Sequence, residues 1–241
     1  MIEPLDVLAV MAHPDDAEIF CGGALIKSAE SGERTGVLDL TAGEAGTRGT
    51  VRSRAREAAA AADVMGLADR RCAGLQDAAL VNDVQSRVVV ARLMRILRPR
   101  VIVTHWTRGR HPDHRAAARL TRDAAFLAGL RKLPAEGAPH RPEKVVYALA
   151  FREDPVKPTF VVDITAQMDR KIEALAAYRS QFQGKSGMGE VFPGGDRPLF
   201  DQIRSVHATY GSLIRRRYGE PYWTEETTEA ETLGTVPVTT F

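Results

Sequence analysis

Residues 5–23 read LDVLAVMAHPDDAEIFCGG, and this stretch decides the fold. The apolar run from Val7 to Met11 is typical of a buried strand. The run ends abruptly in AHPDD, which places His13, Asp15 and Asp16 at the carboxyl end of that strand. In open parallel α/β sheets this is the edge where ligands bind. One histidine and two carboxylates around a rigid proline therefore indicate a metal site rather than a simple turn.

A second cluster follows another apolar strand in the same way. The strand Val101 to Val103 precedes RHPDH at residues 110–114, and Pro112 is well placed to begin a helix. Taken alone, an HPD segment is most simply explained as a turn whose aspartate N-caps the next helix. Two such segments at corresponding strand ends favour a functional site, because no structural need explains both histidines.

Strand and helix patterns alternate through most of the first 130 residues. The alternation predicts an α/β fold, a Rossmann-like three-layer and mostly parallel sheet with right-handed crossovers. No G-x-G-x-x-G follows the first strand, and its acidic turn would repel a pyrophosphate, so we expect no dinucleotide. Strands are predicted at 7–11, 35–41, 70–74, 101–105, 145–151 and 160–164, and helices at 17–30, 51–65, 84–97, 113–130, 166–182 and 199–217.

Composition bounds the class of protein. The 241 residues are 44% hydrophobic and 27% charged, which fits one domain over residues 1–223 and a polar tail at 224–241. A net charge of +2 gives no indication of nucleic-acid binding. Cys21 and Cys72 are too few for a disulfide framework. With no signal-peptide pattern and no membrane-length apolar run, we expect a cytoplasmic protein without a membrane partner.

The two clusters together can supply a metal site. A hydrolytic metal takes about three protein ligands and keeps one position open for water. His13, Asp16 and His114 provide two imidazoles and a carboxylate from two strand ends. This set suits zinc, and it also suits ferrous iron or manganese.

The remaining polar residues of the clusters fit the other roles of an amide hydrolase. Asp15 would stand beside the metal as a free carboxylate that takes a proton from water and returns it to the leaving amine. His111, one helical turn from His114, would donate to the oxyanion as an imidazolium supported by Asp113. His105, at the tip of a strand, is assigned a structural role, with substrate contact as the alternative.

AHPDD after the first strand and HPDH after a later one resemble the signature of PIG-L/LmbE-type zinc-dependent N-acetylglucosamine deacetylases. Within that family the chain is most similar to the bacillithiol-pathway branch, which deacetylates N-acetylglucosaminyl malate. The resemblance runs from about Asp6 to about Tyr222. It is carried by DLTAGEAGTRGT, RHPDHR, AAFLAGLRK, PHRPEKV, FVVDIT, KIEALAAYRSQF and YGE.

The resemblance implies an LmbE-like fold and the same site residues. Zinc is expected on His13, Asp16 and His114, with Asp15 as general base and acid. His111 is expected to stabilise the oxyanion with the support of Asp113. Family members often assemble as trimers or hexamers, so we expect a homo-oligomer.

Substrate recognition is expected to involve arginines. A malate aglycone carries two carboxylates, which guanidinium groups bind bidentately. The resemblance places Arg54, Arg110 and Arg141 around the pocket. The alternative is that some of these arginines simply face solvent. Arg52 stands where the family commonly has an acid.

Three functions follow in order. The first is the malate-type deacetylase, with a small-molecule sugar conjugate as its partner. The second is an amidase or deacetylase of another conjugate, such as a mycothiol precursor or diacetylchitobiose. The third is a non-catalytic metabolite-binding protein, against which Asp15 argues, because a binder has no need for a free carboxylate beside a metal.

Overall fold

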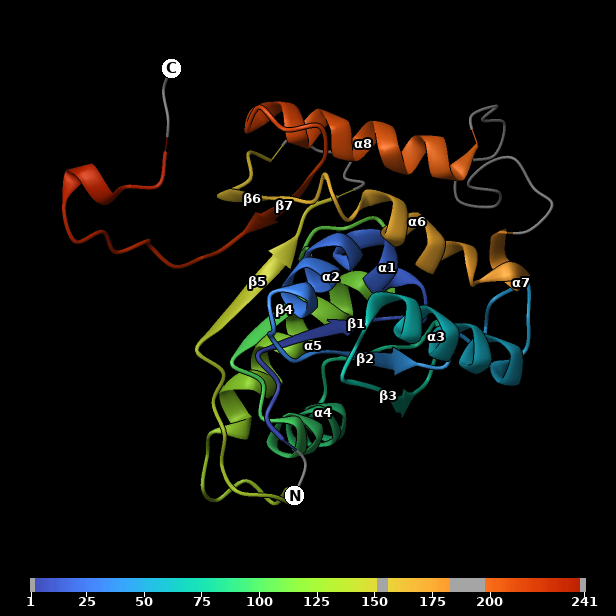
Figure 1. Ribbon diagram of the computed structural model, residues 1–241. Helices are drawn as coiled ribbons and strands as arrows, with labels where there is room; N and C mark the ends of the chain where they lie inside the picture. Colours follow the sequence, from blue (N-terminus) through green and yellow to red (C-terminus); the bar gives the residue numbers. More distant parts are fainter. Residues whose placement is uncertain (1–2, 151–155, 183–197, 239–241) are drawn as a thin grey trace.

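The computed structural model describes residues 3–150, 156–182 and 198–238. Within these residues a seven-stranded sheet forms the central layer, in the order β3-β2-β1-β4-β5-β7-β6 (Figure 1). The first five strands are parallel to their neighbours, whereas β7 is antiparallel to both β5 and β6. The strands are β1 (Val7–Met11), β2 (Thr35–Thr41), β3 (Asp69–Leu75), β4 (Val101–His105), β5 (Lys144–Ala148), β6 (Phe160–Asp163) and β7 (Gly219–Trp223).

Helices cover both faces of the sheet (Figure 1). One face carries α4 and α5, which pack on each other, and the other carries α1, α2, α3 and α6. The helices are α1 (Asp16–Phe20), α2 (Gly22–Glu30), α3 (Val51–Met65), α4 (Val84–Leu97), α5 (Pro112–Ala128), α6 (Met168–Ala176), α7 (Arg179–Phe182) and α8 (Leu199–Leu213), followed by the 3₁₀ turn η1 (Leu233–Thr235). The predicted Rossmann-like, three-layer, mostly parallel architecture is confirmed.

Strand β1 shows why the first apolar run is continuous. Leu8 and Val10 belong to the core beneath α4 and α5, and Ala9 and Met11 belong to the core beneath α2 and α3. Successive side chains of a strand point to opposite faces, so a strand covered on both sides must be apolar throughout.

The strand order creates a crevice beside β1. The chain leaves β1 for β2 on one side and later returns to β4 on the other. The Thr104 hydroxyl donates to the Val10 carbonyl at 2.9 Å, and the Ala12 amide donates to His105 Nε2 at 3.0 Å. These bonds hold the carboxyl ends of β1 and β4 together at the point where open α/β sheets bind ligands.

The structure corrects several predicted boundaries. The helix predicted over 17–30 is divided at Cys21 into α1 and α2, and the one over 166–182 is divided into α6 and α7. The last predicted helix ends at Leu213. Phe151, at the end of one predicted strand, lies outside the described residues. The close approach expected at Gly22-Gly23 is present, because a Cβ on Gly23 would lie 2.8 Å from the Ile164 side chain.

Strand β7 is absent from the sequence prediction. Its sequence, GEPYW, contains a proline and a charge, both of which are poor strand signals. The Glu220 carboxylate is fully buried there and accepts from Lys171 Nζ at 2.6 Å and from the Gly23 and Ala24 amides. Tertiary partners therefore make possible a buried charge in a strand.

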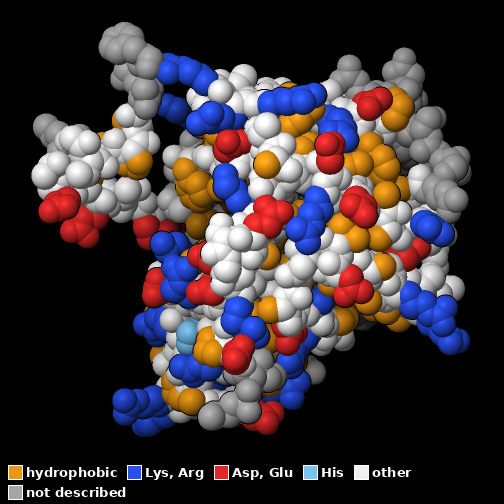
Figure 2. Space-filling model, in the orientation of Figure 1, with side chains coloured by type: hydrophobic (Ala, Val, Ile, Leu, Met, Phe, Trp, Pro, Cys, Tyr) orange, Lys and Arg blue, Asp and Glu red, His pale blue; other side chains and the backbone are white. Residues whose placement is uncertain are grey.

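The surface offers no extended region of one charge on the face shown in Figure 2, where Lys and Arg are interspersed with Asp and Glu. None of the helices in the described residues combines the length and hydropathy needed to cross a bilayer.

Candidate functional site

The loop after β1 presents its polar side chains through local hydrogen bonds. The His13 amide donates to Asp16 Oδ2 at 2.8 Å, and the Asp16 amide donates back to the His13 carbonyl at 3.3 Å. Between them, Asp15 has φ 99°, a left-handed conformation that a non-glycine residue seldom adopts. Such conformations gather at functional sites, where the surrounding structure holds them in place.

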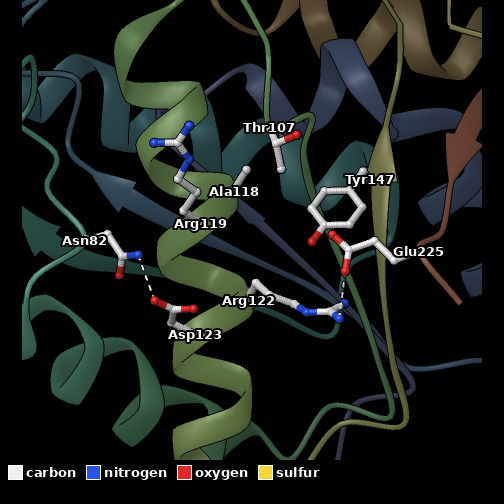
Figure 3. A pocket seen from close by; sticks show the side chains of 8 residues that line it. All are labelled: Asn82, Thr107, Ala118, Arg119, Arg122, Asp123, Tyr147 and Glu225. Carbon is white, nitrogen blue, oxygen red and sulfur yellow. Dashed lines mark hydrogen bonds and ion pairs between the residues drawn. The ribbon is translucent and has the colours of Figure 1, made fainter.

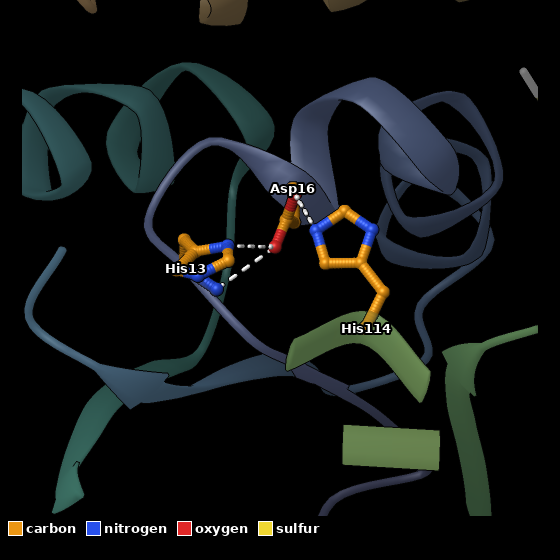
Figure 4. Close-up of side chains that lie close together, drawn as sticks. All are labelled: His13, Asp16 and His114. Carbon is orange, nitrogen blue, oxygen red and sulfur yellow. Dashed lines mark hydrogen bonds and ion pairs between the residues drawn. The ribbon is translucent and has the colours of Figure 1, made fainter. Parts of the chain in front are cut away.

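Asp16 lies at the centre of a group of histidines (Figure 4). Its Oδ1 is 3.2 Å from His114 Nε2, contributed by the first turn of α5. Its Oδ2 is 3.2 Å from His13 Nδ1 and 3.3 Å from His105 Nε2. The structure thus brings together the three predicted metal ligands, whose ligand atoms all lie within 4.8 Å of one another.

The protonation of this group fits a divalent cation. Burial alone would raise the pKa of Asp16, but His114 and His105 outweigh it and hold this pKa well below its ordinary value. Burial lowers the pKa of His114 to about 4. At neutral pH the pair is therefore a carboxylate and a neutral imidazole, the forms that bind metals.

His13 shows that this position favours positive charge. Burial would lower the pKa of His13, but hydrogen bonds to Asp16 and Asp77 outweigh it and raise this pKa to about 11. The Asp113 carboxylate, also buried, adds a further negative charge 3.3 Å from His13 Nε2. A ring surrounded by three carboxylates is a site at which a cation is stabilised.

Asp15 and Arg54 form a largely buried ion pair. Arg54 Nη2 donates to Asp15 Oδ2 at 3.1 Å and to the Pro14 carbonyl, and Nη1 donates to the Gly43 carbonyl at 3.3 Å. Burial raises the pKa of Asp15 to about 8, and Arg54 opposes this effect. Arg54, predicted as a substrate ligand, therefore uses its guanidinium to hold the AHPDD loop.

His111 differs from its predicted state. Its Nδ1 accepts from the Asp113 amide at 3.2 Å at the start of α5. Burial, together with His114 and His13, lowers the pKa of His111. The ring is accordingly neutral at pH 7, with its proton on Nε2, and it can still donate a hydrogen bond.

The Asp113 carboxylate has a different task from the predicted support of the His111 ring. It accepts from the Ala78 amide at 2.8 Å and from the Leu80 amide at 3.4 Å. It therefore anchors the loop after β3 against the site.

The other two predicted arginines lie in different places. Arg110 is exposed and directly precedes His111. Arg141 donates to the Phe126 carbonyl at 3.3 Å and lies over the Phe126 ring, at the far end of the 17-residue helix α5. A helix of that length spans about 25 Å. Within one chain, Arg141 is thus separated from the histidine cluster.

Two residues of the site lie outside the predicted set. His105, assigned a structural role, contacts Asp16 and stacks on His114 with ring centroids 3.9 Å apart. Asp77, in the loop after β3, lies 3.1 Å from His13 Nε2. The available signal was the one used for the two clusters: an acid just after the carboxyl end of a strand.

A separate cavity lies beside α5 (Figure 3). Its volume is about 310 Å³. Its polar side chains pair with one another, since Asn82 donates to Asp123 and Arg122 pairs with Glu225, both at 2.8 Å. None of the cluster residues lines it, so this cavity is separate from the candidate metal site. Its lining residues are Asn82, Thr107, Ala118, Arg119, Arg122, Asp123, Tyr147 and Glu225.

Comparison with known proteins agrees with this geometry. The PIG-L family model, described as GlcNAc-PI de-N-acetylase, matches residues 8–125, which contain both clusters. The crystal structure of the conserved protein TT1542 from Thermus thermophilus is 38% identical with a TM-score of 0.84, covering 94% of this chain and 97% of that one.

Two curated relatives carry functional names. The diacetylchitobiose deacetylase of Thermococcus kodakarensis is 29% identical, over 89% of this chain and 80% of the relative. A Bacillus cereus protein named probable N-acetyl-alpha-D-glucosaminyl L-malate deacetylase 2 is also 29% identical, over 73% of this chain and 83% of the relative. With its two histidine clusters inside the matched range, the chain belongs to the PIG-L family of de-N-acetylases.

Proposed function

We propose that this protein hydrolyses the acetamide of an N-acetylglucosaminide with the help of a divalent metal, and that N-acetylglucosaminyl malate is its substrate. The observation that carries the proposal is the convergence of His13, Asp16 and His114 with an additional, largely buried carboxylate, Asp15, beside them. A binding protein needs the first three residues at most. A hydrolase also needs the fourth, to move a proton.

His13, Asp16 and His114 would hold the metal. We propose zinc, and the same two imidazoles and carboxylate would also accept ferrous iron or manganese. When bound, the metal supplies Lewis acidity to water and to the acetamide carbonyl.

Asp15 acts as the proton carrier. It takes a proton from the attacking water as the water oxygen bonds to the acetyl carbon, and it gives that proton to the amine as the C–N bond breaks. Acetate and the free glucosamine amine are the products. A pKa raised to about 8 suits a group that must accept and return a proton near neutral pH. Arg54 keeps the carboxylate in place through its bond to Oδ2.

His111 donates to the oxygen that becomes negatively charged. Its Nδ1 is occupied by the Asp113 amide, which leaves the Nε2 proton for the substrate. A neutral imidazole is a sufficient donor in a site shielded from water.

The malate aglycone is the finer part of the proposal. Its support is the 29% identity to the Bacillus cereus relative and the exposed Arg110 next to His111. Because Arg54 is engaged with Asp15, Arg110 is the arginine of the predicted set that remains near the site to bind a carboxylate. Arg141 joins it only if a homo-oligomer, such as a trimer or hexamer, brings a second chain to the pocket.

The second candidate is a diacetylchitobiose deacetylase, favoured by the 29% identity to the Thermococcus kodakarensis relative over most of both chains. The test measures amine release by the zinc-loaded protein from N-acetylglucosaminyl malate, diacetylchitobiose and N-acetylglucosaminyl inositol, with Asp15→Ala as the control. Turnover of the malate compound alone, lost in the variant, supports the proposal. Turnover of another sugar changes the substrate, and turnover of none by a zinc-bound protein argues for a binding role.

A further inference from the structure

The two nitrogens of the His13 ring face different surroundings. Nδ1 lies 3.2 Å from Asp16 Oδ2, on the side of the proposed metal ligands. Nε2 lies 3.1 Å from Asp77 Oδ1 and 3.3 Å from Asp113 Oδ2. A ring nitrogen that binds a metal must present its lone pair, so the proton has to stay on the other nitrogen. The carboxylates at Nε2 favour that arrangement.

Asp77 is itself held firmly by backbone groups. Its side chain is 7% exposed. Oδ2 accepts from the Ala45 amide at 2.9 Å, and Oδ1 accepts from the Ala78 amide at 2.7 Å. Its own backbone amide donates to Glu44 Oε1 at 2.8 Å. The loops after β2 and β3 thereby exchange hydrogen bonds, and the Asp77 carboxylate has a defined position against His13.

Asp113 is a less direct partner of His13. Its Oδ2 is slightly farther from Nε2, and the same oxygen already accepts the Ala78 amide at 2.8 Å. Asp77 Oδ1 is nearer. The geometry therefore favours Asp77 as the main acceptor of the Nε2 proton.

We propose that Asp77 is a positioning residue that holds the proton of His13 on Nε2 and so presents Nδ1 to the metal. The inference rests on the proposed metal site. A carboxylate behind a metal-ligating histidine orients the ring and raises its basicity, and its loss typically costs about 10–100-fold in metal affinity. Asp77 also connects His13 to the glycine-rich loop after β2, because the Ala45 amide donates to its Oδ2.

The experiment measures zinc affinity by competition with a chromogenic chelator for the wild type, Asp77→Ala and Asp77→Asn. Asp77→Ala is expected to weaken zinc binding by about 10–100-fold. Asp77→Asn keeps the shape of the side chain but has only one oxygen, which cannot serve the Ala45 amide, the Ala78 amide and His13 together. It should therefore weaken binding as well, and it carries the test if the alanine variant does not fold.

The control is Asp69→Ala, which removes a carboxylate from β3 that pairs with Arg71 at 2.9 Å away from the site. Its zinc affinity should equal that of the wild type. A second readout is nitrogen–proton NMR of the zinc-loaded protein. The His13 Nε2 proton should exchange slowly in the wild type and in Asp69→Ala, and faster in the Asp77 variants.

The outcomes separate this inference from the proposed function. Asp77 variants that bind zinc as tightly as the wild type overturn the inference, since Asp113 alone would then hold His13, and they leave the deacetylase proposal standing. A zinc-loaded wild type that releases no amine from any of the three sugars overturns the proposed function, while weaker zinc binding by the Asp77 variants would still support the positioning role.

Discussion

Arg54 donates to the Asp15 carboxylate at 3.1 Å and to the carbonyl of Pro14, the residue before it. Asp15 has a positive φ of 99°, and Arg54 is 5% exposed. One guanidinium thus holds both the backbone and the side chain of the proposed proton carrier. Arg54 acts on the chemistry through Asp15, and this can be distinguished from substrate binding.

Replacing Arg54 with alanine should lower kcat by about 100-fold, the cost expected when a catalytic group moves by about 1 Å. It should also destabilise the protein by about 3–5 kcal/mol, because a largely buried carboxylate loses its partner. Arg54→Lys keeps the charge but not the two-sided donation, so its kcat should be intermediate. Steady-state kinetics and urea unfolding measure both effects. An unchanged kcat with a raised KM for the malate substrate would instead assign Arg54 to substrate binding.

Asp15→Asn removes the proton carrier while preserving its shape. Amine release should fall by about 100- to 10,000-fold, the range expected for loss of a general acid–base group. Stability should be retained or improved, since asparagine tolerates positive φ and carries no buried charge. Zinc content should be unchanged, because Asp15 is not among the proposed ligands. Substantial activity in this variant would assign proton transfer to another group.

The buried Lys171–Glu220 pair should be sensitive to the loss of one partner. Both side chains are fully buried and lie 2.6 Å apart. Lys171→Met should destabilise the protein by about 3–5 kcal/mol, and the double variant with Glu220→Gln should recover part of that loss. Urea unfolding at pH 7 measures both. The control is Arg204→Met, which breaks the exposed pair with Asp169 and should cost about 0–1 kcal/mol. Equal losses in the buried and exposed pairs would contradict the prediction.

His207 should make the protein less stable in acid. Burial lowers the pKa of His207 to about 3, from an ordinary value of 6.5. Between these values the unfolded chain binds a proton that the folded chain does not. Stability therefore falls as the pH drops from 6.5 towards 3, by up to about 1.4 kcal/mol per pH unit. Urea unfolding of the wild type and His207→Gln between pH 7 and pH 5 should show a shallower slope in the variant. Parallel slopes would mean that His207 does not titrate as expected.

Much of the fold was predictable because its signals are local. The continuous apolar run at Val7–Met11 indicates a strand covered on both faces, and the structure places β1 in the middle of the sheet. Strand β7 was not predictable, because Glu220 and Pro221 are poor strand signals. The buried charge is stabilised by Lys171 and by amides of α2, which are remote in sequence.

The sequence by itself determined that His13, Asp16 and His114 would meet, because strands of a parallel sheet end at a common edge and each cluster directly follows such a strand. Only the tertiary structure decided what surrounds them. Arg54 faces Asp15 rather than open solvent, and Asp77 lies behind His13. Local patterns specify which face or end of an element a residue occupies. Contacts between separate loops depend on how those loops pack, and no periodicity within one segment records that.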